Sequence, residues 1–127
     1  MKLSLKLTYM SGMKDGESIL LQPEEGSTEV TLGRSEDCTV AISHDPQLSR
    51  KHACLLWNKA AGSWMIEDLN STNGTFVGEF GQSKRITEPT PLAYGDIFRI
   101  GHTSFRPEPP QNNDTELSAE AYAQINQ

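Results

Sequence analysis

The chain has 127 residues and a formal net charge of −6, and this length fits one domain with a core of ordinary size. No apolar run approaches the roughly 20 residues that a membrane-spanning helix needs, so no membrane association is predicted. Near the N-terminus, lysines alternate with leucines and no apolar segment of a signal peptide follows. We therefore expect a cytoplasmic protein.

Charge is distributed unevenly along the chain. Residues 1–106 contain 11 basic and 13 acidic side chains, whereas residues 107–127 contain four acidic side chains and no Lys or Arg. Because binding to a nucleic-acid backbone needs clustered cations, nucleic acid is not an expected partner. Cys38 and Cys54 lack metal-ligand spacing, so we expect buried or half-buried thiols, with no metal and no cofactor.

Alternating apolar and polar residues predict β-strands along most of the chain. The first is expected at residues 3–9, and Asp15-Gly16 is typical of a hairpin turn before a return strand. Further strands are predicted at residues 18–21, 29–32, 39–42, 53–57, 63–68, 75–77, 97–100 and 103–105. Residues 78–96 are expected to form a polar connection.

Many short strands with closely spaced turns predict an all-β fold, an antiparallel β-sandwich of two twisted sheets. The domain is expected to comprise residues 1–106, because Pro107 begins a proline-containing, polar and acidic segment. We expect residues 107–127 to be a disordered tail with a weak helical pattern at residues 117–125.

Three short motifs fall between predicted strands, and the first is Gly33-Arg34. Glycine permits a close backbone approach or a positive φ. The planar guanidinium of Arg34 matches two phosphate oxygens in a way that lysine does not. A surface arginine paired with a carboxylate is the alternative interpretation of this residue alone.

The second motif, Ser49-Arg50-Lys51-His52, precedes a predicted strand. The Ser49 hydroxyl can donate a hydrogen bond to a phosphate oxygen, and the two cations add positive charge. A strand-initiating turn with solvated cations is the alternative. Ser49 and His52 also suggest a nucleophile and its base, but no orienting third residue or nucleophile-elbow sequence accompanies them, so we predict no enzyme activity.

The third motif, Leu69-Asn70-Ser71-Thr72-Asn73-Gly74-Thr75, combines short polar side chains with a turn. Such side chains bond either their own backbone or a docked peptide. In this order and spacing, on a β-rich background, the three motifs resemble the forkhead-associated (FHA) domain, a family that binds phosphothreonine peptides. The resemblance covers roughly residues 5–106 and implies a sandwich of about 11 strands.

The resemblance assigns the phosphopeptide contacts to Arg34, Ser49, Arg50, Thr72 and Asn73. Within this set, Asn73 would bond the peptide backbone beside the phosphothreonine and the others would bond the phosphate. The family varies at the positions of Arg50 and Lys51, and we favour Arg50 as the phosphate contact. Structural roles fall to Gly33, His52 and Gly74, of which His52 would brace the binding loops.

Rim or specificity contacts are expected at Leu48, Lys51, Asn70 and Ser71. In similar domains, the loops at residues 44–48 and 70–73 form a pocket for the residue three places after the phosphothreonine. The function implied is a non-catalytic adaptor that recognises phosphothreonine in a partner protein, downstream of a Ser/Thr kinase. One alternative is an assembly domain that binds independently of phosphorylation. Another is self-regulation, in which phosphorylated Thr115 of the tail docks into its own or a neighbouring domain.

Overall fold

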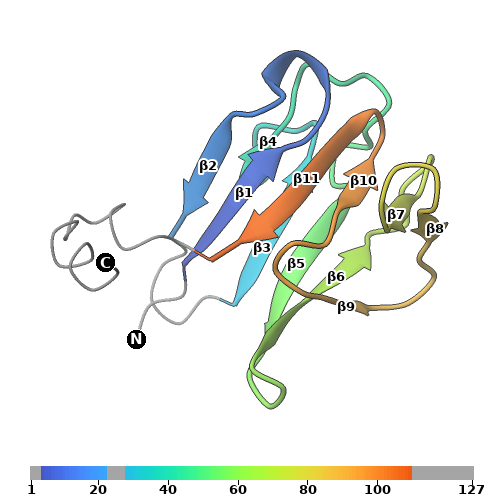
Figure 1. Cartoon of the computed structure of the whole chain (residues 1–127). Coiled ribbons are helices and arrows are strands. Elements are labelled where there is room, and N and C mark those ends of the chain that lie inside the picture. The colour runs from blue at the N-terminus through green and yellow to red at the C-terminus, as the bar shows by residue number, and fades with distance from the viewer. Residues whose placement is uncertain (1–3, 23–27, 110–127) are drawn as a thin grey trace, which may run out of the picture.

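The computed structural model describes residues 4–22 and 28–109, and these form two β-sheets without an α-helix (Figure 1). The strands are β1 (Leu5–Tyr9), β2 (Ser18–Leu21), β3 (Glu29–Gly33), β4 (Val40–Ala41), β5 (Ala53–Asn58), β6 (Ser63–Asp68), β7 (Thr75–Val77), β8 (Lys84–Arg85), β9 (Thr90–Leu92), β10 (Phe98–Ile100) and β11 (Thr103–Glu108). A short 3-10 turn, η1 (Gly12–Lys14), lies between β1 and β2. No helix in these described ranges is long and apolar enough to cross a membrane.

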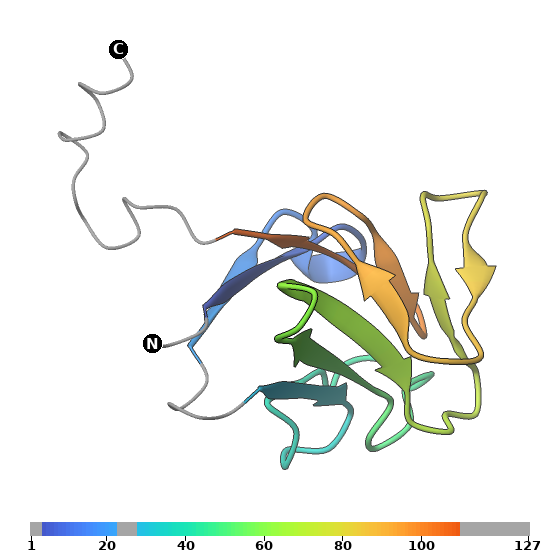
Figure 2. The same ribbon diagram turned by 90° about the horizontal axis from the view of Figure 1, so that it is seen from below.

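The two sheets face each other as a sandwich, which is clearest in Figure 2. One sheet has the order β2-β1-β11-β10-β7-β8 and the other β4-β3-β5-β6-β9. The predicted all-β sandwich is confirmed. One pairing differs from the expected antiparallel pattern, because β4 runs parallel to β3. The chain reverses direction in the loop after β3. Two hydrogen bonds hold the returning segment beside β3: the Thr31 backbone N–H donates to Thr39 Oγ1, and the Thr39 backbone N–H donates to Thr31 Oγ1.

Alternation along the strands places one face of each sheet in the core, as the sequence pattern predicts. The core cluster contains 17 buried hydrophobic residues from both sheets. Phe98 of β10 stacks on Phe105 of β11 with ring centroids 5.5 Å apart. Cys38 and Cys54 are both buried and free, which confirms the prediction of unpaired thiols, and burial raises the pKa of Cys54 to about 12.

Two strands and one strand end differ from the sequence prediction. Strands β8 and β9 lie inside the segment expected to be a connection; they are two and three residues long, too short to show an alternating pattern. Strand β11 continues past residue 106 to Glu108, with Pro107 paired to Leu7 and its carbonyl accepting a hydrogen bond from Gly95 N–H. The predicted domain boundary therefore falls within a strand. Residues 110–127, including Thr115, lie outside the described residues.

The loops that carry the three motifs meet at one end of the sandwich. Strands β3 and β6 both end there, beside the first residue of β5, because Ala53 pairs with Leu32 on one side and Asp68 on the other. The turn between β10 and β11 lies at the same end, whereas the β5–β6 turn and the end of β11 lie toward the other (Figure 1). The fold thus gathers residues 34–39, 43–52 and 69–74.

Candidate functional site

The first motif forms a close crossing of two backbones. A Cβ atom on Gly33 would stand 2.1 Å from the carbonyl oxygen of Arg50, so only glycine fits. The next two backbone N–H groups bond the neighbouring loop: Arg34 to the Ser49 carbonyl and Ser35 to the Arg50 carbonyl, each at 3.1 Å. Gly33 therefore serves the close approach of two loops rather than a positive φ.

The Arg34 side chain is held in one orientation while its end remains exposed. Its Nε donates a hydrogen bond to the Leu48 carbonyl at 3.1 Å. Its two terminal nitrogens have no hydrogen bond or ion pair with any residue in the described ranges. A guanidinium fixed at Nε presents its terminal N–H groups as a planar fork, the geometry that matches two oxygens of one anion.

His52 joins the second motif to the third beneath the surface. It is fully buried. Its Nδ1 lies 3.1 Å from the backbone nitrogen of Ser49, and its Nε2 lies 2.8 Å from the Gly74 carbonyl oxygen. Because a backbone N–H can only donate, Nδ1 accepts and Nε2 carries the hydrogen that Gly74 accepts. The neutral ring therefore couples the β4–β5 loop to the β6–β7 loop.

Ser49 lies between Arg34 and Thr72 at the surface. Its Oγ accepts a hydrogen bond from the Thr72 backbone N–H at 3.0 Å, which leaves its own hydroxyl hydrogen available to donate outward. The Thr72 side chain is exposed. Asn73 extends toward the same loop, where its Nδ2 donates to the backbone and side-chain oxygens of Gln47 at 2.8 and 3.1 Å. The structure thus brings these four predicted contacts together.

Asp68 organises the turn that presents Thr72 and Asn73. Its carboxylate accepts hydrogen bonds from the Ser71 hydroxyl and the Thr75 hydroxyl at 2.5 and 2.6 Å, and from the Ser71 backbone N–H at 3.0 Å. Burial raises the pKa of Asp68, but these hydrogen bonds outweigh it, so the net pKa lies below its ordinary value. An ionised carboxylate is therefore part of the folded turn.

Two of the expected rim residues have structural positions instead. Ser71 is only 8% exposed, and its hydroxyl bonds Asp68 and accepts from the Gly74 backbone N–H at 2.9 Å. Leu48 is 2% exposed and belongs to the core cluster. Neither side chain is placed to meet a peptide from the surface. Asn70 is exposed and has φ of 62°, a conformation that asparagine tolerates better than most residues.

Arg50 and Lys51 lie together on the other side of the crossing. Both are exposed, and with Ser35 and Asp37 they line one shallow hollow. The Arg50 backbone is fixed, because its carbonyl accepts from both Ser35 N–H and the Cys38 thiol. The two cations therefore extend from a rigid backbone and share their hollow with the acidic Asp37.

The sequence analysis gave no individual role to three residues that act through the tertiary structure: Arg85, and Asp45 and Gln47 of the predicted pocket loop at residues 44–48. Asp45 is 3% exposed and accepts from the backbone N–H groups of Gln47 and His102 and from the Thr103 hydroxyl. It thereby ties the β4–β5 loop to the β10–β11 turn. Gln47 holds Asn73, and the Arg85 side chain packs where a Gly74 Cβ would stand, with Nε 2.6 Å from that position.

Acid should weaken the β6–β7 turn. Because the folded-state pKa of Asp68 is lowered from 3.8, its stabilising contribution is present at higher pH and is lost as pH falls through the folded-state value. We expect Asp68→Asn to lower the free energy of unfolding at about pH 6 and to reduce the further loss between about pH 4 and 2. Urea unfolding across this range measures both. An Asp68→Asn chain whose stability falls as steeply as that of the wild type would contradict this role, and exposed Asp15→Asn is the control.

The comparisons with known proteins match this geometry. The family model for the FHA domain matches residues 30–101, which is more than half of the chain, so the chain belongs to the FHA domain family. Domains of this family are generally non-catalytic binding modules. The predicted family is confirmed. In the described ranges, no group of three or more His, Cys, Asp or Glu side chains is arranged to hold a metal ion.

Relatives and solved structures give the same family. FhaB of Mycolicibacterium smegmatis, an FHA domain-containing protein, is 32% identical over 98 residues, covering 77% of this chain and 56% of that protein. Mycobacterium tuberculosis EmbR, solved with a low-affinity phosphopeptide, is similar with 26% identity and a TM-score of 0.65, over 83% of this chain and 24% of that one. A structure from a study of phosphothreonine-dependent FHA domain interactions is 28% identical, with a TM-score of 0.63. The match covers 86% of this chain and 99% of that one. The chain spans less than two thirds of the curated relatives' length, as little as 12% of one.

Proposed function

We propose that this chain is a non-catalytic adaptor module that binds a phosphothreonine-containing segment of a partner protein at the loop end of the sandwich. The arrangement around Ser49 carries the proposal. An oriented arginine fork, a hydroxyl with a free hydrogen and the exposed Thr72 side chain adjoin one another there. The FHA relatives studied with phosphopeptides support the same ligand class.

Phosphorylation would act as the switch for binding. A phosphothreonine carries nearly two negative charges and three acceptor oxygens, whereas unmodified threonine offers none of these to Arg34. Hydrogen bonds to charged groups contribute about 1.5–3 kcal/mol each, and ordering a flexible peptide offsets part of that gain. An upstream Ser/Thr kinase therefore follows from the proposal. The two free cysteines fit a reducing compartment such as the cytoplasm.

Binding should weaken in mild acid. The second pKa of a phosphate ester is about 6, and the dianion offers Arg34 and Ser49 more charge than the monoanion does. We expect the affinity for a phosphothreonine peptide to fall as pH drops from about 7.5 to about 5. Calorimetric titration at several pH values measures it. Equal affinity at both ends of this range would contradict recognition of the dianion.

Preference for phosphothreonine over phosphoserine would come from a slot for the γ-methyl group. One buried methyl contributes about 0.8 kcal/mol, which corresponds to roughly fourfold in affinity. Matched degenerate peptide libraries with phosphothreonine, phosphoserine or unmodified threonine test the function. Selective retention of the phosphothreonine library supports it, and the enriched flanking residues describe the partner. A folded chain that retains none of the libraries refutes it.

A phosphorylation-independent assembly domain is the competing function. It predicts partner binding that survives phosphatase treatment, and nothing in it requires the oriented Arg34 or the free Ser49 hydroxyl. Self-regulation through phosphorylated Thr115 is a variant of the leading proposal. A Thr115-phosphorylated chain that stays monomeric and still binds external peptide normally would eliminate that variant.

A further inference from the structure

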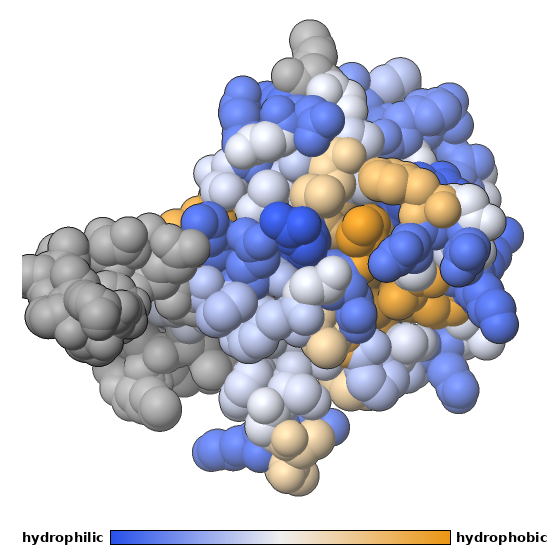
Figure 3. Space-filling model, viewed as in Figure 1, coloured by the Kyte–Doolittle hydropathy of each residue, from blue (hydrophilic) through white to orange (hydrophobic). Residues whose placement is uncertain are grey.

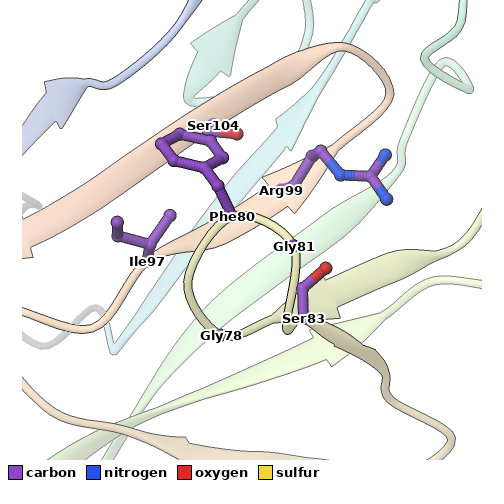
Figure 4. Close-up of a pocket in the computed structure, with 7 residues that line it drawn as sticks. All are labelled: Gly78, Phe80, Gly81, Ser83, Ile97, Arg99 and Ser104. Carbon is purple, nitrogen blue, oxygen red and sulfur yellow. The ribbon is translucent and has the colours of Figure 1, made fainter.

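A second hollow lies on the outer face of the six-stranded sheet, away from the motif loops. It forms between the loop that joins β7 to β8 and the strands β10 and β11. In Figure 4, the Phe80 ring extends from this loop over β11, with Ile97 and Arg99 on its two sides and Ser104 behind it. Phe80 is 58% exposed although it is a large hydrophobic residue. The ring therefore offers an apolar contact at the edge of a hollow whose lining is mixed polar and apolar.

The Ser104 hydroxyl lies beneath this ring without a partner. Ser104 is 1% exposed, and its Oγ forms no hydrogen bond with any residue in the described ranges. A buried hydroxyl without a hydrogen-bond partner destabilises the folded state. The Phe80 loop contains Gly78 and Gly81, both with positive φ.

The same face carries positive charge. Across four neighbouring strands, the register aligns Ser104 with Arg99, Arg99 with Phe76, and Phe76 with Arg85. The Arg99 guanidinium lies over the Phe76 ring at 4.2 Å. No residue of this row is acidic, although Glu79 precedes Phe80 in the loop and Glu108 ends β11. Figure 3 shows apolar surface on this side of the molecule bordered by hydrophilic side chains. The chemistry suits a partner that combines acidic and apolar side chains.

The chain's own C-terminal segment has that composition and begins on the same sheet. Residues 110–127 contain Asp114, Glu116 and Glu120 beside apolar residues such as Leu117, and they contain no Lys or Arg. This segment follows β11, and Ser104 lies four residues before Glu108, about 14 Å along the strand. An extended chain from Pro109 to Leu117 spans up to about 27 Å, so Leu117 reaches the hollow.

We propose that residues 114–125 of the same chain dock on this outer face, with an apolar side chain in the hollow beside Phe80 and an acidic side chain facing Arg99. Arg106 also belongs to this face, because it alternates with Phe105, which points into the core, but its guanidinium is already paired with Glu108, with Nη2 2.7 Å from Oε2. Docking here covers the exposed aromatic ring. It also keeps the acidic segment away from the cations of the motif loops, which leaves the proposed peptide site open.

The test compares amide NMR spectra of the full chain with those of the variant Glu116→Lys/Glu120→Lys, each in wild-type and Phe80→Ser backgrounds. In the wild-type background, the two Glu→Lys changes should shift the amide resonances of Gly81, Arg99 and Ser104. The same changes should cause no such shift in the Phe80→Ser background or at high salt. Tyr94→Ser, which removes an exposed aromatic ring elsewhere, is the control background and should preserve the change. Phe80 is largely exposed, so its replacement is compatible with folding.

Three outcomes would overturn the proposal. The first is no shift change at these amides, or one that persists unaltered in the Phe80→Ser background. The second is a change that grows with protein concentration, which would assign the face to a second copy. The third is a change confined to the amides around Arg34, Ser49 and Thr72, which would place the acidic segment at the peptide site.

Discussion

Replacing Arg34 by alanine is expected to reduce phosphothreonine-peptide affinity about 100-fold or more, because two charge-assisted hydrogen bonds of about 1.5–3 kcal/mol each would be lost. The fold should survive. The only hydrogen bond that the side chain makes in the described structure is from Nε to the Leu48 carbonyl, so the free energy of unfolding should change by about 1 kcal/mol or less. Calorimetric binding and urea unfolding of the same variant measure the two effects separately.

Two further variants show whether the shape or only the charge of Arg34 matters. Arg34→Lys keeps the charge but removes the planar fork, and its affinity should lie between those of the wild type and Arg34→Ala. Lys59→Ala removes one positive charge from the β5–β6 turn at the other end of the sandwich, and should leave binding unchanged apart from a small screened electrostatic effect. The proposed site would be wrong if Arg34→Ala bound phosphopeptide as tightly as Lys59→Ala.

Gly33→Ala is expected to cause the largest loss of stability among single-methyl changes, about 3 kcal/mol or more. The new Cβ would lie 2.1 Å from the Arg50 carbonyl oxygen and 2.8 Å from its carbonyl carbon. Both are backbone atoms, so relief requires the two loops to separate, which also breaks the bonds from Arg34 and Ser35 to the neighbouring loop. Urea unfolding measures the loss, and peptide binding should fall with it.

Gly62→Ala is the matched control for this variant. Gly62 has φ of +66° and open space around its Cβ position, so alanine there costs only the backbone strain of about 1–2 kcal/mol. The comparison separates a steric clash between loops from the ordinary cost of replacing a glycine. Equal losses for the two variants would show that the loops can move apart easily, and that Gly33 does not hold them together.

Much of the fold could be predicted from the sequence because most strands have one buried face. The alternation in β1, β3 and β10 marks core positions such as Leu7, Val30 and Phe98, all fully buried. The two-residue strands carry no such pattern. The parallel pairing of β4 depends on a loop that doubles back, which neighbouring residues along the chain do not reveal.

The site was predictable to the extent that its chemistry lies in short motifs. The sequence indicated Arg34, Ser49, Thr72 and Asn73, which the folded chain brings to one surface. The burial of individual side chains could not be predicted from these motifs. In the sequence, Ser71 resembles an exposed loop serine, and only the folded structure shows its hydrogen bonds to the Asp68 carboxylate. The contacts of Asp45, Gln47 and Arg85 likewise join separate loops and strands.

The most direct test of the central claim is an amide NMR titration of the full chain with a degenerate phosphothreonine peptide pool, alongside the same pool after phosphatase treatment. We predict shift changes confined to residues 34–35, 47–51 and 70–74 that disappear with the phosphatase-treated pool and in Arg34→Ala. Changes confined to the outer face of the six-stranded sheet, or equal changes with both pools, would contradict recognition of phosphothreonine by the loop end.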